Sequence, residues 1–272
     1  MNERVPVACT VAGSDSGGGA GLQADLRTFA FHRVHGCSSV TALTVQNTLT
    51  VAEVFPIEVR LVVAQLDAVH ADIGLDALKC GLLGRAELVD AVAAWLAIHP
   101  ALPVVLDPVM VSRHGVRFVD DATVEALRGS ILRRAAIVTP NRREAEELTG
   151  LTIANVDDAA RAASELVARG ARAALVKGGG FEGKDRAHDV FATRDGVEHL
   201  VDAVVPTIHT HGTGCTLAAA ITARLARGEP LRDAVLGAKQ YVHRALEHSL
   251  AIGHGQGPVG HFWPLAGRKD AP

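Results

Sequence analysis

The sequence lacks any run of basic residues and carries little net charge. It has 27 lysines and arginines against 30 aspartates and glutamates, which gives a formal net charge of −3. This balance argues against a surface built to bind nucleic acid or a membrane. Residues 1–4 lead directly into a short apolar segment, without the longer apolar run of a secretory signal. We therefore expect a cytoplasmic protein with neither nucleic-acid nor membrane partners.

Cysteine is also scarce, and the histidines follow no metal-binding pattern. The four cysteines, at positions 9, 37, 80 and 215, are far apart, and most lie in apolar segments. This distribution is typical of buried, reduced thiols and excludes a cysteine-based metal motif. The 13 histidines form no HExxH motif, so we expect no zinc site. Only Cys215 has an unusual setting.

Short apolar segments alternate with helical patterns along a chain of 272 residues that is 48% hydrophobic. Strands are expected at 5–12, 37–45, 77–80, 104–106, 136–139 and 173–176. Helices are expected at 22–35, 59–69, 86–99, 123–128, 142–148, 157–169, 216–226 and 231–251. The alternation predicts an α/β fold, with a mostly parallel central sheet and helices on both faces. Residues 189–193 and 197–201 flank Arg-Asp-Gly and predict a late antiparallel hairpin at one sheet edge. With no repeat or linker, we expect one domain spanning residues 1–272.

A glycine turn at residues 210–215, Thr-His-Gly-Thr-Gly-Cys, precedes an Ala- and Leu-rich helical segment. A helix N-terminus offers free backbone N–H groups and the positive end of a dipole, which favour an anion. The N–H groups of Gly212–Cys215 therefore suit charge that develops during group transfer. This position is expected to lower the pKa of the Cys215 thiol and make it an acid or base candidate. The alternative is an ordinary glycine-rich helix start with a buried cysteine.

A second small-residue loop, residues 12–21, also runs into a helix, and two such loops suggest a phosphorylated ligand between them. Two GxGxxG matches, at 178–183 and 255–260, lack the strand-loop-helix context of a dinucleotide site or a P-loop. We therefore assign no function to either match.

Polar residues follow three of the expected buried strands, where ligands of open α/β folds bind. Lys177, one of only five lysines, precedes three glycines and suits either a phosphate contact or strand-end solvation. Asp107 precedes a proline and suits either a metal or phosphate site or a turn. Asn141 and Glu144 begin a helix, which the dipole explains without any function.

In their order, these motifs resemble the hydroxymethylpyrimidine/phosphomethylpyrimidine kinases of the thiamine pathway, a branch of the ribokinase-like superfamily. The matching segments cover nearly the whole chain: AGSDSGGGAGLQADL, TALTVQNT, DPVMV, VTPNRREAEEL, VKGGG, THGTGC and GHGQGPVGHF. The resemblance implies a ribokinase-like three-layer fold, use of ATP and Mg²⁺, and a homodimer.

The resemblance also implies roles for individual residues. Cys215 is expected to take the proton of the substrate hydroxyl or to orient that hydroxyl, beside an anion hole at Gly212, Thr213 and Gly214. ATP is expected at Asn141, Lys177, Thr210 and His211, and the metal at Glu144 and Asp107. The substrate pocket is expected at Gln46, Gly13, Asp25 and Val45. A glutamine amide offers an acceptor and a donor side by side, which matches an exocyclic amino group next to a ring nitrogen.

The activity implied is ATP-dependent phosphorylation of 4-amino-5-hydroxymethyl-2-methylpyrimidine, and then of its monophosphate to the pyrophosphate. The nearer alternative is a pyridoxal or pyridoxine kinase, because the same branch includes such enzymes and the loops barely differ. The other alternative is a catalytically silent protein that binds a thiamine precursor. Glu144, Lys177 and Cys215 together argue against that alternative, and absence of ATP turnover would argue for it.

Overall fold

A computed structural model describes residues 4–112 and 115–266. Within this part of the chain, nine strands form one sheet in the order β3-β2-β1-β4-β5-β6-β7-β8-β9. The strands are β1 (Val7–Ser14), β2 (His35–Gln46), β3 (Val51–Pro56), β4 (Ala77–Cys80), β5 (Val104–Leu106), β6 (Ile137–Val138), β7 (Ala173–Val176), β8 (His188–Thr193) and β9 (Gly196–Val201). The six strands from β2 to β7 in this order are parallel, whereas β3, β8 and β9 pair antiparallel with their neighbours.

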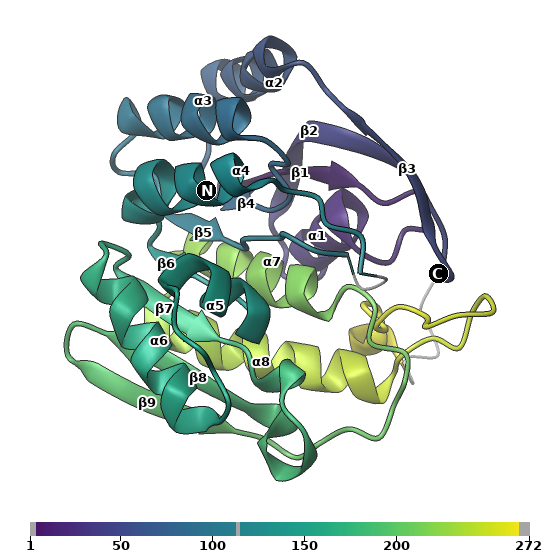
Figure 1. The fold of residues 1–272 in the computed structure, drawn as a ribbon. Coiled ribbons are helices and arrows are strands. Elements are labelled where there is room, and N and C mark those ends of the chain that lie inside the picture. Colours follow the sequence, from purple (N-terminus) through teal and green to yellow (C-terminus); the bar gives the residue numbers. More distant parts are fainter. Residues whose placement is uncertain (1–3, 113–114, 267–272) are drawn as a thin grey trace.

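Helices cover both faces of the sheet (Figure 1). The α-helices are α1 (Gly21–Phe31), α2 (Val59–Asp72), α3 (Ala86–Ala97), α4 (Asp121–Ala126), α5 (Arg142–Thr149), α6 (Val156–Ala168), α7 (Thr213–Ala226) and α8 (Leu231–Glu247). Short 3-10 or π-helical turns occupy Leu127–Ile131, Leu132–Arg134, Gly178–Gly180, Gly183–Ala187 and Trp263–Leu265. One apolar core joins α2 to α6 with one face of the sheet, and two further clusters join α1, α7 and α8 with the other. The three-layer α/β fold expected from the sequence is confirmed.

The hairpin expected near residues 189–201 is present as β8 and β9, at one edge of the sheet. The strand β3 was not expected; it pairs antiparallel with β2 at the opposite edge. Its side chains are mostly exposed or half-buried, so it lacks the apolar run by which buried strands are recognised. The largest differences in helix length are at the C-terminal ends of α1 and α8, which stop four residues earlier than expected, at Phe31 and Glu247.

The parallel strands all direct their carboxyl ends to the same edge of the sheet, and the candidate residues follow those ends. Loops after β1, β2, β5, β6 and β7 carry them, and the N-terminus of α7 reaches the same edge. In the described residues, we find no helix that is long and apolar enough to cross a membrane.

Candidate functional site

One large pocket, with a volume of about 1240 Å³, lies at the carboxyl edge of the sheet. It brings together most of the residues singled out from the sequence. They are Gly13, Gln46, Asp107, Asn141, Glu144, Lys177, Thr210, His211, Gly212, Thr213, Gly214 and Cys215. Segments up to two hundred residues apart in sequence therefore form one cavity, at the place where open α/β sheets bind ligands.

The turn at residues 210–215 lines this pocket. Gly212 caps α7 with a φ of 80°, and a Cβ there would overlap the carbonyl oxygen of Gly19, so only glycine fits. The Thr213 N–H donates to the Thr210 carbonyl (3.3 Å), whereas Gly214 and Cys215 follow in the first helical turn, where N–H groups lack intrahelical acceptors. A Cβ on Gly214 would lie 3.1 Å from Lys177 Nζ. An ammonium group and free amides therefore adjoin one another, as an anion site requires.

Cys215 is half-buried at this turn, and its sulfur accepts a hydrogen bond from the backbone N–H of Gly21. Burial raises the pKa of the thiol to about 12, although the nearby Lys79 ammonium opposes the shift. The expectation of a lowered thiol pKa is therefore wrong. The cause is that desolvation disfavours a thiolate, and the charges of Asp107 and Asp25 add to the effect.

Lys177 lies between two buried carboxylates. Its Nζ is 2.9 Å from Asp107 Oδ1 and 4.0 Å from Glu144 Oε2. Burial disfavours its charge, but Asp107 and Glu144 outweigh burial and raise the pKa of Lys177. The pKa of Asp107 is low because Lys177 and Lys79 outweigh its burial. Burial raises the pKa of Glu144 to about 7 despite the attraction of Lys177.

Asn141 and Glu144 form a capping box at the start of α5. Glu144 N–H donates to Asn141 Oδ1 (3.0 Å), and Asn141 N–H donates to Glu144 Oε2 (2.8 Å). The ordinary helix-start explanation therefore holds for both residues. It does not exclude a role in the site, because both also line the pocket and an isolated bridge pairs Asn141 with Lys177.

The residues chosen as metal ligands match a hard cation in chemistry. Within residues 4–112 and 115–266, no three His, Cys, Asp or Glu side chains are arranged to hold a metal ion. Asp107 and Glu144 nevertheless present carboxylate oxygens to one position, which Lys177 now approaches. Mg²⁺ prefers carboxylate oxygens, keeps several waters and needs few protein ligands when phosphates supply the rest. These two residues therefore fit such an ion.

His211 lies at a different end of the pocket from the one expected. Its Nε2 is 2.9 Å from Asp15 Oδ2 and 3.3 Å from Gln46 Nε2, so it adjoins the expected pyrimidine reader. Its expected contact with ATP stays a prediction. Asp15 was missed in the sequence, although an aspartate followed by three nearby glycines is a known signal for a carboxylate that accepts loop N–H groups.

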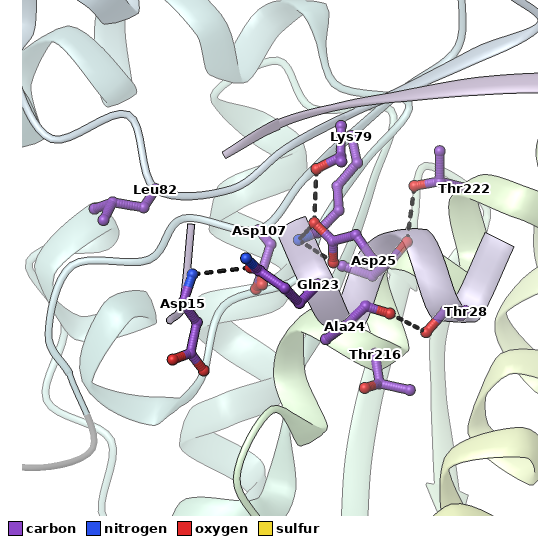
Figure 2. Close-up of polar contacts among 12 residues, drawn as sticks. Asp15, Gln23, Ala24, Asp25, Thr28, Lys79, Leu82, Asp107, Thr216 and Thr222 are labelled. Atoms are coloured by element: carbon purple, nitrogen blue, oxygen red, sulfur yellow. Dashed lines mark hydrogen bonds and ion pairs between the residues drawn. The ribbon is translucent and has the colours of Figure 1, made fainter. Parts of the chain in front are cut away.

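Two residues expected in the substrate pocket do not line it. Asp25 is fully buried and bonds Lys79 Nζ through both oxygens (2.8 Å each), as Figure 2 shows. Val45 is 50% exposed, because successive strand residues point to opposite faces and its neighbours Thr44 and Gln46 take the pocket side. Both substrate assignments are wrong for the side chains.

Comparison with known proteins gives a consistent result. The family model described as phosphomethylpyrimidine kinase matches residues 15–260. A hydroxymethylpyrimidine/phosphomethylpyrimidine kinase of Synechococcus elongatus is 50% identical over 261 residues, covering 96% of this chain and 99% of that protein. This chain therefore spans nearly the full length of that relative.

Two solved structures extend the comparison. A pyridoxal kinase of Bacillus subtilis in complex with ADP is 35% identical, with a TM-score of 0.88, covering 95% of this chain and 98% of that one. A phosphomethylpyrimidine kinase of Clostridium difficile is 36% identical, with a TM-score of 0.78, covering 88% of this chain and 99% of that one. The ribokinase-like fold is thus confirmed, and the chain belongs to the phosphomethylpyrimidine kinase family.

Proposed function

We propose that this protein transfers the γ-phosphoryl group of ATP to the hydroxymethyl oxygen of 4-amino-5-hydroxymethyl-2-methylpyrimidine. It then phosphorylates the monophosphate to the pyrophosphate, in thiamine biosynthesis. The observation that carries the proposal is that one pocket holds the Gly212–Cys215 turn, Lys177 and Gln46. Phosphoryl transfer needs positioning and charge neutralisation more than covalent help, and these groups supply both.

The charge of the transferring phosphoryl group would be met by the amides of Gly214 and Cys215 and by Lys177. Lys177 stays protonated because Asp107 and Glu144 raise its pKa despite burial. Cys215, at the first turn of α7, would orient the acceptor hydroxyl as a neutral thiol, and it could take the hydroxyl proton only after losing its own. A loose transition state needs little proton removal beforehand, which fits a thiol with a pKa of about 12.

We assign the metal to Glu144 and Asp107, whose carboxylates lie on either side of Lys177. Mg²⁺ bound there would neutralise charge on the ATP phosphates. Glu144→Gln should then weaken use of MgATP by roughly one to three orders of magnitude, while pyrimidine binding stays nearly intact. Kinetics with unchanged ATP dependence would contradict the assignment. Asn141 and Thr210, which both line the pocket, are proposed ATP contacts.

The pyrimidine would lie against Gln46 and the backbone of Gly13. Gly13 lacks a side chain where Leu82 and Ala42 approach, so a flat ring can come close to the backbone. The amide of Gln46 can accept from the exocyclic amino group and donate to the ring nitrogen beside it. His211 joins this end of the site through its contact with Gln46.

The experiment is a product assay with MgATP and the hydroxymethylpyrimidine, in which the mono- and diphosphorylated products are separated by chromatography. We expect both products in sequence, with ADP formed in equal amount at each step. Binding of the pyrimidine without any ATP turnover would instead identify a silent precursor-binding protein. Turnover that stops at the monophosphate would contradict the second step.

A second candidate, pyridoxal kinase activity, is favoured by one observation. The pyridoxal kinase of known structure superimposes on nearly the whole chain. A competition assay between the pyrimidine and pyridoxal, at equal concentrations, measures the ratio of the two kcat/KM values directly. A ratio in favour of pyridoxal would replace the first proposal with this one.

We also propose that the protein is a cytoplasmic homodimer, the compartment following from its need for ATP. Support for the dimer comes from β2 and β3, which expose Leu43 (49%), Val45 (50%) and Phe55 (52%). Leu43 and Phe55 are paired across the two strands and therefore share a face. An exposed apolar face on an edge hairpin suits a second copy of the chain.

A further inference from the structure

The loop after β1 is fastened to the turn before α7 by a side-chain hydrogen bond between Asp15 and His211. Asp15 is 4% exposed, and its carboxylate accepts from the N–H groups of Gly17 (2.9 Å), Gly19 (3.0 Å) and Ala20 (2.8 Å). The remaining partner is His211 Nε2, at 2.9 Å. Burial alone would raise the pKa of Asp15, but the hydrogen bond and charge of His211, together with the N–H groups, lower it. Asp15 is therefore an ionised carboxylate that accepts at every contact.

The position of the His211 ring is set by the segments around it. A Cβ on Gly19 would overlap the imidazole, so the ring packs directly on a glycine backbone. The backbone N–H of His211 donates to the Gly257 carbonyl (3.1 Å), and the backbone carbonyl of His211 accepts from the Val259 N–H (3.2 Å). Three segments that are far apart in sequence thus hold one imidazole beside Gln46.

These contacts determine which nitrogen of His211 carries a proton. An ionised carboxylate can only accept, so the 2.9 Å contact requires a proton on Nε2. The same Nε2 lies 3.3 Å from Gln46 Nε2, yet a protonated imidazole nitrogen cannot accept from an amide NH₂ group. A half-turn of the amide exchanges its nitrogen and oxygen without other change, and the oxygen can then be the second, weaker acceptor of the Nε2 proton, in a bifurcated bond whose main acceptor is Asp15.

We propose that Asp15 and His211 are positioning residues that orient the Gln46 amide, with its oxygen toward His211 and its NH₂ group turned to the ligand. The inference rests on the proposed function, because it describes how the Gln46 amide would distinguish the pyrimidine from other ligands. The second lone pair of the oxygen then accepts from the exocyclic amino group, and the NH₂ group donates to the ring nitrogen. In the opposite orientation an NH₂ group would face the amino group, donor against donor, and specificity would be lost.

Two variants separate this role from simple packing. The side-chain NH₂ group of a glutamine at position 211 can take the place of the histidine Nε2 as a donor. The shorter asparagine side chain ends near the place of the histidine Nδ1 and cannot reach Gln46. We expect His211→Asn to raise the KM for the pyrimidine about tenfold, as loss of one hydrogen-bonded contact in a desolvated site does, with much smaller changes in kcat and in the KM for ATP. His211→Gln should recover most of the loss. The control is His209→Asn, because His209 lies outside the pocket lining and the asparagine keeps an acceptor for Gly257 N–H.

A double-mutant cycle tests the coupling between His211 and Gln46. Pyrimidine binding is measured by calorimetry for Gln46→Ala, for His211→Asn and for both together. Once residue 46 has no amide, His211→Asn should cost little further affinity. An equal loss in both backgrounds would mean that His211 acts independently, and the proposal would fall.

The wild-type protein gives a test that needs no variant. The ¹⁵N chemical shifts of His211 distinguish a protonated from an unprotonated Nε2, and we expect Nε2 to carry the proton. An unprotonated Nε2 would overturn the proposal even if the variants unfold. Failure of the wild-type protein to bind or phosphorylate the pyrimidine would instead count against the proposed function and would leave the ¹⁵N result as it stands.

Discussion

Cys215 combines a helix N-terminus, which favours a thiolate, with burial, which opposes one. Burial prevails, because the pKa is raised to about 12. The side chain therefore acts as a neutral thiol until ligand binding changes its surroundings. Its place beside Gly214 and Lys177 still puts it next to the proposed acceptor oxygen.

The first prediction concerns this thiol. Cys215→Ser nearly keeps the volume but raises the intrinsic pKa, so kcat should fall about 10²-fold or more if proton transfer contributes as it usually does. Rapid-quench kinetics under conditions where phosphoryl transfer limits the rate measure the effect. Cys37→Ser, a matched change at a buried cysteine outside the pocket lining, should leave kcat unchanged. A wild-type kcat for Cys215→Ser would assign the chemistry to the amides and Lys177 alone.

The second prediction concerns Glu144, whose pKa burial raises from 4.5 to about 7. Between these values the unfolded chain releases a proton that the folded protein keeps, so the free energy of unfolding falls as pH rises. The expected contribution is about 3 kcal/mol, present below pH 4.5 and lost by about pH 7. In Glu144→Gln, which can keep the capping bond to Asn141 N–H, this loss should be absent. Urea unfolding of both proteins across this range measures it, and parallel pH curves would contradict the raised pKa.

At the scale of elements, a buried ion pair joins the helix α1 to the strand β4. Asp25 and Lys79 are both fully buried, and Thr10 of β1 donates a further hydrogen bond to Asp25 (2.6 Å). Figure 2 shows the pair on the side of α1 that faces the sheet. Burial costs both charges their hydration, and the partner's charge, with the hydrogen bond from Thr10 to Asp25, offsets that cost.

The third prediction follows from this arrangement. Lys79→Met should lower the free energy of unfolding by about 3–5 kcal/mol, because it leaves Asp25 charged and unpaired. Asp25→Leu combined with Lys79→Met should recover much of that loss, since both charges are then removed. Chemical denaturation of the two single variants and the double variant measures the coupling. A double variant as unstable as the sum of the single variants would show that the ion pair is not what joins these elements.

Buried elements were easier to predict from the sequence than exposed ones. Strands such as β4 and β7 are short and wholly buried, so their apolar runs mark them. The edge strand β3 is half exposed and was missed. Local periodicity also indicates which side chains turn away from the pocket: Asp25 is three residues from Leu22 and four from Phe29 on the buried face of α1, and Val45 alternates with Thr44 and Gln46 on β2.

The residues of the site likewise divide into those that the sequence predicts and those that it does not. Positions that follow strand ends or begin a helix, such as Lys177 and the Gly212 turn, were predictable because topology brings those ends together. The contact between Asp15 and His211 was not, because it joins residues 196 positions apart through two loops. The pKa of Cys215 was also misjudged, since it depends on burial and on Asp107 and Asp25, none of which local sequence reveals.

At the scale of the whole molecule, the two faces of the hairpin formed by β2 and β3 have different proposed roles, one in substrate binding and one in dimer formation. Its inner face carries Thr44 and Gln46 into the pocket, and its outer face exposes Leu43, Val45 and Phe55. A dimer formed through the outer face would also hold the inner face in place. Oligomeric state and pyrimidine binding should therefore change together.

The fourth prediction tests this link with Phe55→Glu. In a symmetric dimer the change removes two apolar side chains from the interface, each worth about 1.5–3 kcal/mol, so the dimer dissociation constant should rise by roughly 10²-fold or more. Sedimentation velocity at micromolar concentration should then show a monomer, and the KM for the pyrimidine should rise more than the KM for ATP, because Gln46 lies on the same hairpin. Ile98→Glu, an equally apolar position that is 73% exposed after α3, is the control and should stay dimeric. A wild-type protein that sediments as a monomer would contradict the dimer, and a monomeric Phe55→Glu variant with an unchanged pyrimidine KM would separate dimer formation from substrate binding.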